Sequence, residues 1–189
     1  MSAASALSEL THNRWALPVL AHVAQHGGCK FVTLSRRLGA APASLRRALH
    51  RLGELGLVIR NPGYGHPMRP EYVLGPVGER TEGLASSLLQ WIEADGLSDE
   101  LLKKWQLPVL VGLGSEPCRF GEIRRGVPAT PRAVTLALKS HGALGLVSRH
   151  IIGDYPPVPL YAVTGRGRVG RAPALQLGRV LAAGGATPE

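Results

Sequence analysis

Residues 31–56 read FVTLSRRLGAAPASLRRALHRLGELG and contain two helical patterns with a turn between them. Apolar residues lie on one helix face from Phe31 to Leu38, and they recur every three or four positions from Leu45 to Leu55. Pro42 lies in the turn, and Gly56 is the residue type that ends a helix in a left-handed conformation. The segment therefore predicts a short helix, a tight turn and a longer amphipathic helix.

Apolar segments on both sides extend this pattern into a complete small domain. The expected elements are a helix over Trp15–Val23, strands over Leu57–Ile59 and Tyr72–Leu74, a loop over 61–70, and a helix from about Val77 to Ala94. The loop is rich in Pro and Gly, which favours a connection within a hairpin. Two short helices joined by a tight turn and followed by a two-stranded hairpin are the pattern of a winged helix-turn-helix.

The same pattern occurs twice in the chain. Residues 14–20, RWALPVL, reappear as KWQLPVL at 104–110, an offset of 90 residues. One residue is then lost, and an offset of 89 takes LGLV at 55–58 to the same four letters at 144–147. A period this long is that of a domain, because the repeats of solenoid proteins are shorter.

The second copy predicts the same elements at the shifted positions. They are a helix over Trp105–Leu113, a short helix over Phe120–Val127, a helix over about 132–144, strands over Leu146–Ser148 and Tyr161–Val163, and a helix over Gly167–Ala183. We expect two domains, residues 1–95 and 96–189, and an α+β, mainly α, fold class. The tandem winged helix-turn-helix domains are expected to pack in a pseudo-two-fold arrangement through their first and last helices.

These motifs resemble the HxlR-type winged-helix transcriptional regulators, a family near the wider MarR group. The resemblance is carried by the Trp-x-Leu-x-x-Leu opening at Trp15, FGEI at 120–123, and the wing ends RPEYVLG at 69–75 and VPLYAVT at 158–164. It implies DNA-binding repressors or activators that act as homodimers of one such domain. This chain differs because it carries both domains covalently. It also lacks a Cys shortly before Trp15 or Trp105, where thiol-sensing members tend to carry one.

The composition fits an intracellular DNA-binding protein. The chain has 22 Lys and Arg residues against 13 Asp and Glu, and its net charge of +9 attracts the phosphates of duplex DNA. Two cysteines cannot form the disulfide framework of a small secreted protein. Residues 1–10 lack the basic and apolar regions of a signal peptide, and no apolar run approaches the roughly 20 residues that span a bilayer. We therefore expect a cytoplasmic protein of the bacterial nucleoid without membrane association.

The second helix of each helix-turn-helix is expected to enter the major groove, with its N-terminal part against the base edges. In the first domain this helix, about 43–55, presents Ala43, Ser44, Arg46, Arg47, His50 and Arg51. In the second domain the helix at about 132–144 presents Arg132, Ala133, Thr135 and Lys139. An arginine at such a position can donate two hydrogen bonds to guanine O6 and N7, which distinguishes G from the other bases.

The other predicted DNA contacts lie on the wings and on the short helices. The wing residues are Arg60, His66 and Arg69 in the first domain and Arg149 and His150 in the second. The short-helix residues are Arg36, Arg37, Arg124 and Arg125, with Arg36 and Arg125 as the predicted contacts and the other two facing solvent. Phosphate contacts of this kind position a protein on DNA without reading its sequence.

Three other signals favour weaker alternatives. Residues 165–170, GRGRVG, fit the dinucleotide-binding GxGxxG pattern, but the preceding strand belongs to a hairpin and no βαβ unit is predicted. The spacing of His22, His26 and Cys29 could hold a metal, yet only the cysteine recurs in the second copy, so a small buried residue is the simpler interpretation. His141 replaces a leucine of the first copy and is expected to be a satisfied core or interface histidine.

No catalytic constellation recurs in both copies, so we expect neither an enzyme nor a cofactor or metal. We expect a sequence-specific regulator that binds double-stranded DNA, blocks or recruits polymerase, and is open to tuning by a small-molecule effector. One chain would bind as a monomeric pseudo-dimer, or two chains as a homodimer, with recognition helices about one turn, ~34 Å, apart. Because the two helices differ in sequence, a tandem chain can read an asymmetric site.

Two alternatives remain open at this point. One is a small-molecule-binding protein, or an enzyme, that uses the cleft between the repeats, and a large apolar pocket with converging polar groups would favour it. The other is a nonspecific architectural DNA-binding protein, which would bind with steep salt dependence and no preferred sequence.

Overall fold

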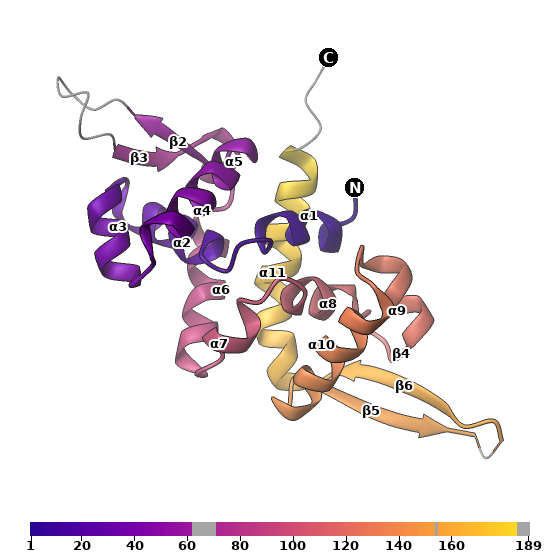
Figure 1. Cartoon of the computed structure of the whole chain (residues 1–189). Coiled ribbons are helices and arrows are strands. Elements are labelled where there is room, and N and C mark those ends of the chain that lie inside the picture. The colour runs from indigo at the N-terminus through magenta and orange to yellow at the C-terminus, as the bar shows by residue number, and fades with distance from the viewer. Residues whose placement is uncertain (62–70, 154, 185–189) are drawn as a thin grey trace.

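The computed structural model describes residues 1–61, 71–153 and 155–184, which form a mainly helical α+β fold with two small sheets (Figure 1). Two winged helix-turn-helix units follow one another along the chain, and their wings extend toward opposite ends of the view. Within the described residues, no helix is both long enough and apolar enough to cross a membrane.

The first unit contains the three helices and the two wing strands that the sequence predicts before its closing helix. Its helices are α2 (Ala16–His26), α3 (Phe31–Leu38) and α4 (Pro42–Glu54), and its wing strands are β2 (Val58–Asn61) and β3 (Glu71–Leu74). Pro18 lies in the first turn of α2, where a missing N–H costs no intrahelical hydrogen bond. Gly56 follows α4 with a φ of 65°, which confirms the predicted left-handed helix end.

The second unit repeats this plan. Its helices are α8 (Gln106–Gly112), α9 (Phe120–Gly126), α10 (Pro131–Ala143) and α11 (Gly165–Gly184), and its wing strands are β5 (Val147–Ile152) and β6 (Val158–Val163). The register of the two wings is equivalent, because Arg60 pairs with Tyr72 in one and Arg149 with Tyr161 in the other. Thr164 Oγ1 accepts a hydrogen bond from the Gly167 amide at 3.1 Å and so caps the start of α11.

Two features differ from the sequence prediction, one in both units and one in the first unit alone. A two-residue strand, β1 (Cys29–Lys30) or β4 (Cys118–Arg119), adds a third strand to each sheet by pairing with β3 or β6. The single closing helix predicted over 77–94 is wrong, because the chain forms α5 (Pro76–Glu79) and α6 (Glu82–Ala94) instead. Thr81 lies buried at the break, and its hydroxyl donates to the Gly78 carbonyl at 2.7 Å. A side-chain bond to a nearby carbonyl of this kind competes with continuation of the helix.

The N-terminal helix α1 (Ala3–Leu10) was not expected from the repeat. Ser2 caps it by accepting a hydrogen bond from the Ser5 amide at 3.1 Å. Its apolar face packs against α8 and α11 of the second unit, beside which it lies in Figure 1. The short helix α7 (Ser98–Leu101) precedes α8 at the start of the second unit. Residues 1–10 therefore contribute to the core of the other half of the chain.

The two units share one continuous core. Helix α6 packs against both α2 and α11, and the buried apolar side chains of both units form a single cluster. Two glycines of α11 allow close helix packing, since a Cβ at Gly170 would overlap the ring of Trp91 and a Cβ at Gly178 would lie 2.5 Å from Ala3 O. Packing against α6 explains one glycine of the GRGRVG motif, Gly170.

The two recognition helices differ in their N-terminal caps. Thr130 caps α10, and its Oγ1 accepts a hydrogen bond from the Ala133 amide at 3.3 Å. Ala41 occupies the same position before α4 and offers no side-chain acceptor. We expect Ala41→Thr to raise the free energy of unfolding by about 1 kcal/mol, and Thr130→Ala to lower it by a similar amount. Equilibrium urea unfolding of both variants checks this, and equal midpoints for both would contradict a capping role.

Candidate nucleic-acid interface

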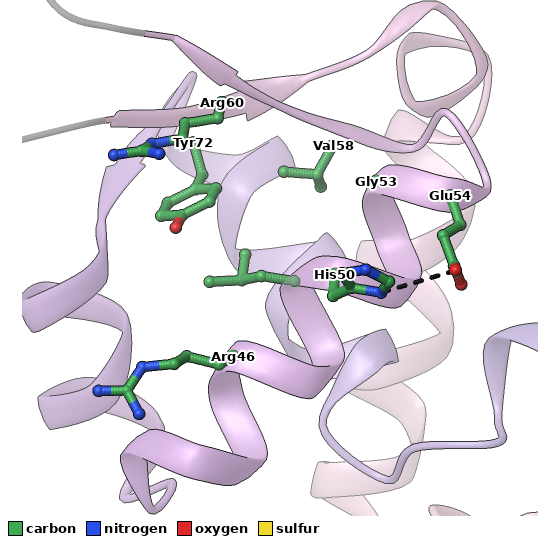
Figure 2. Close-up of a pocket in the computed structure, with 8 residues that line it drawn as sticks. Arg46, His50, Gly53, Glu54, Val58, Arg60 and Tyr72 are labelled. Atoms are coloured by element: carbon green, nitrogen blue, oxygen red, sulfur yellow. Dashed lines mark ion pairs between the residues drawn. The ribbon is translucent and has the colours of Figure 1, made fainter.

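A groove of about 440 Å³ separates α4 from the wing sheet of the first unit (Figure 2). Its lining residues are Arg46, Leu49, His50, Gly53, Glu54, Val58, Arg60 and Tyr72. Arg46 and His50 come from the exposed side of α4, whereas Arg60 and Tyr72 come from the wing strands that face it in Figure 2. The groove thus brings together residues of the helix and the wing that the sequence assigned to DNA separately.

The second unit contains an equivalent groove of about 400 Å³ between α10 and its own sheet. Its lining residues are Thr135, Leu138, Lys139, Gly142, Ala143, Val147, Arg149 and Tyr161. Each of the eight lies 89 residues after its counterpart in the first groove. The wing arginine and tyrosine are retained, while the helix side of the groove changes in sequence. The repeat therefore preserves this hollow as a unit and varies the groups that the helix presents.

Most of the predicted recognition residues of α4 are exposed, and several are already oriented by neighbours. The Arg46 guanidinium lies over the ring of Phe31, 5.7 Å from its centroid, a cation–π contact that holds its side chain toward α3. Arg47 Nη2 donates to Oγ of the half-buried Ser44 at 3.2 Å. His50 Nδ1 lies 3.6 Å from a carboxylate oxygen of Glu54, the pair marked by a dashed line in Figure 2.

The corresponding residues of α10 are also exposed but carry fewer charges. Arg132 and Lys139 face solvent, whereas the hydroxyl of Thr135 donates to the Pro131 carbonyl at 2.9 Å within its own helix. Arg60 and Arg149 extend from β2 and β5, both of them exposed. Each unit thus presents a basic residue of the helix and a basic residue of the wing on the two sides of one groove.

Arg51 is placed differently from the expectation. It is only 28% exposed and forms ion pairs with Glu9 of α1 and Glu54 of its own helix, the latter at 2.8 Å. Its Nε also donates to the Glu9 carbonyl at 3.3 Å. The hydrogen bond from Arg51 holds the pKa of Glu54 below its usual value. These contacts join α4 to α1, so Arg51 has no free donor face comparable to that of Arg47.

The short helices present the four predicted arginines to solvent. Arg36 and Arg124 are exposed, and Arg125 Nε donates to the Gly121 carbonyl at 3.4 Å. Arg37 Nη1 lies 3.0 Å from His26 Nε2, which directs it toward the end of α2. His66 and Arg69, predicted for the first wing, lie outside the described residues.

Two of the histidines considered for other roles, His22 and His141, lie in the core. The rings of His22 and His26 stack with their centroids 4.1 Å apart. Burial raises the pKa of the Cys29 thiol and so keeps the thiol protonated. Among the residues that the structure describes, no group of three His, Cys, Asp or Glu side chains could hold a metal. His141 is completely buried, and neither ring nitrogen has a hydrogen-bond partner in the described chain. His141 is therefore a core histidine, as expected, but the expectation that its ring would be hydrogen-bonded is wrong for the described residues.

One exposed apolar residue of α10 was not among the contacts predicted from the sequence. Leu136 is 57% exposed on the same helix as Arg132 and Lys139. The repeat contains the signal that could have found it, because an offset of 89 places Leu136 at the position of Arg47.

A third hollow bears on the alternative of a site between the repeats. It measures about 310 Å³ and is lined by residues of α1, α11 and the segment after α4, with Met1, Glu9, Leu55, Val77 and Leu181 among them. The carboxylate of Glu9 is already paired with Arg51. The hollow therefore offers an apolar wall but few uncommitted polar groups, unlike a built ligand site.

Comparison with known proteins gives two findings. The model of the HxlR-like helix-turn-helix family matches residues 10–99 and, separately, residues 100–177. An uncharacterized HTH-type transcriptional regulator of Methanothermobacter thermautotrophicus is 34% identical over 71 residues, which are 37% of this chain and 54% of that protein. The chain thus spans about half the length of this curated relative. No solved structure matches the chain.

Proposed function

Because the chain belongs to the HxlR-like helix-turn-helix family, we propose that it is a transcriptional regulator whose two units bind double-stranded DNA in a sequence-specific way. Each unit would place its second helix, α4 or α10, in the major groove and its wing on the phosphates or the minor groove. The observation that carries this proposal is the groove built twice between helix and wing, with an exposed basic residue on each side.

The proposed contacts are the residues predicted from the sequence, with one exception. The base-reading residues are Ser44, Arg46, Arg47 and His50 of α4 and Arg132, Thr135 and Lys139 of α10. The phosphate contacts are Arg36, Arg60, Arg125 and Arg149, with Arg69 as a further wing contact. We leave Arg51 out of this set because its guanidinium is committed to Glu9 and Glu54. Its proposed role is to fix α4 against α1.

The shared core supports binding by one chain as a covalent pseudo-dimer. Residues 1–95 and 96–189 would then be two domains about a pseudo-two-fold axis, with recognition helices about 34 Å apart. Helix α1 packs on the second unit, so the two halves form one body rather than two independent modules. The proposal therefore predicts two half-sites separated by one helical turn for a single chain.

Removing the two wing arginines together is expected to weaken DNA binding about tenfold or more, because each would lose a charge-assisted hydrogen bond to a phosphate. The plot of log affinity against log salt concentration should become shallower by about 1 for each phosphate that is no longer neutralised. Fluorescence anisotropy with a labelled duplex at several salt concentrations measures both quantities for Arg60→Ala/Arg149→Ala.

Arg168→Ala/Arg179→Ala is the charge-matched control. Both arginines are exposed on α11, outside both grooves, so their removal should leave the salt slope nearly unchanged. If the wing variant and this control lower the affinity equally, the wings do not contact phosphates and only the overall charge matters.

The direct test of function is selection of the purified full chain on a random duplex library near physiological salt, followed by sequencing. Enrichment of a defined site supports a sequence-specific regulator, and the spacing of its half-sites shows whether one chain or two occupy it. Binding without enrichment would favour an architectural protein instead. Absence of binding would overturn the proposal.

A further inference from the structure

The exposed faces of α4 and α10 present different side chains at equivalent positions. Positions that share the exposed face of α4 are Ala43, Arg47 and His50, whereas the equivalent positions of α10 are Arg132, Leu136 and Lys139. Residues three and four apart on a helix lie on one face, so each set forms a short row. All six side chains are exposed, which leaves both rows free to touch a partner.

The arginine of the exposed row lies one helical turn earlier in α10 than in α4. In α4 the guanidinium is in the middle of the row at Arg47, with the small apolar Ala43 before it. In α10 the guanidinium comes first, at Arg132, and the middle position is Leu136. Four residues correspond to about 6 Å along a helix axis, which is close to two base-pair steps. Two helices docked in the same way would therefore place their arginines over different bases.

Leu136 places an exposed apolar side chain between two basic residues of α10. It is 57% exposed, and it lies one turn from Arg132 and from Lys139 on a helix whose opposite face is fully buried. We take DNA as the partner because Leu136 and its basic neighbours lie on the second helix of the helix-turn-helix, which the proposed function places in the major groove. In the major groove those charges find phosphates and base acceptors, and the leucine meets the one apolar group there, the C5-methyl of thymine.

We propose that the chain reads two non-identical half-sites, in which Arg47 selects guanine in one and Leu136 selects thymine in the other. Arg132 selects guanine about two base-pair steps from that thymine in the second half-site, because it lies one helical turn before Leu136. This inference rests on the proposed DNA binding and adds which base each unit recognises. The different order of groups in the two rows also gives a single chain a fixed direction on its site.

Exchange of the two residues tests the assignment. Selection on a random duplex library with the parent chain is expected to return a site with a G·C pair in one half and a T·A pair at the matching position of the other. Leu136→Arg should shift the preference at that thymine toward guanine by about tenfold. Arg47→Leu should relax or convert the guanine in the first half and leave the second half unchanged. Both residues are exposed, so neither exchange disturbs the core.

A single-methyl probe gives a second, independent readout. Replacing the selected thymine by deoxyuridine removes only the C5-methyl, and the affinity of the parent chain should fall about threefold to fivefold, as for one buried carbon. Leu136→Ala should bind both duplexes equally. Val169→Ala, an exposed apolar residue of α11, should retain the parent's discrimination.

The outcomes separate this inference from the proposed function. Failure of the parent chain to bind any duplex contradicts DNA binding itself. Sequence-specific binding to two identical half-sites, or equal affinity of the parent for the thymine and deoxyuridine duplexes, overturns the inference and leaves the proposed function intact.

Discussion

Gly167→Ala is expected to lower the free energy of unfolding by about 3 kcal/mol, because the added methyl has no room. A Cβ at this position would lie 2.2 Å from Leu146 O and 2.9 Å from a methyl of Val163. The Leu146 carbonyl also accepts a hydrogen bond from the Thr164 amide at 3.0 Å, so it cannot turn away without losing that bond. Equilibrium denaturant unfolding of the full chain measures the change.

The repeat supplies both a replicate and a control for this prediction. A Cβ at Gly78 would meet the Leu57 carbonyl oxygen at 2.0 Å, so Gly78→Ala should cost about as much as Gly167→Ala. At Gly142, inside α10, the nearest atom would be 3.9 Å away, and alanine should stabilise the helix by about 0.5–1 kcal/mol. Similar unfolding midpoints for Gly167→Ala and Gly142→Ala would show that the close approach of α11 to the sheet is not rigid.

His141→Leu is expected to stabilise the protein by about 1–3 kcal/mol at pH 7.5, although it removes a polar residue from a recognition helix. Both ring nitrogens of His141 are buried without a partner in the described residues, and an unsatisfied buried group costs free energy. The first unit shows that leucine fits, since Leu52 occupies the equivalent position and is completely buried. Thermal or urea unfolding of the variant measures the gain.

The gain should grow as the pH falls. Burial lowers the pKa of His141 to about 4, against the nearby negative charge of Glu100, which acts in the opposite direction. The unfolded chain takes up a proton near pH 6.5 and the folded chain only near pH 4, so protonation favours the unfolded state between these values. The parent should lose about 3 kcal/mol relative to His141→Leu between pH 7.5 and pH 4.

Comparing unfolding of the parent and the variant at each pH removes the contributions of the titrating groups that do not interact with His141. His22, whose pKa burial also lowers, titrates in both proteins and cancels in the difference. A stability difference that stays constant between pH 7.5 and pH 4 would mean that His141 gains a charge at its ordinary pKa, and that its burial is not maintained.

Elements with a clear local pattern could be predicted closely from the sequence. The recognition helices expected at about 43–55 and 132–144 begin and end within one residue of α4 and α10, because an apolar stripe and a flanking Pro and Gly define them locally. The strands β1 and β4 could not be found in this way. Each is two residues long and exists only through pairing with a strand more than forty positions later.

The interface could be predicted in kind but not in detail. Basic residues on the second helix and the wing were found because charge and helix position are visible in the sequence. The commitment of Arg51 depends on Glu9, which lies on a helix that the repeat did not reveal. The lack of a hydrogen-bond partner for His141 depends on the residues of α7 and α8 that surround its ring, and no local sequence pattern contains that information. Packing between segments that are distant in the sequence therefore determines the surroundings of both Arg51 and His141.

Because α1 packs against α11, a contact of the first helix must wait during synthesis until α11 has been made. Ala3 leaves the ribosome long before Gly178, which forms the close approach that receives it. At about 5–20 residues per second, the interval between them lasts on the order of ten to thirty seconds. During that time the leucines of α1, Leu7 and Leu10, have none of their final neighbours on α11. Helix α1 therefore leaves the ribosome with its apolar face exposed, and its contact with α11 forms only after α11 has been synthesised.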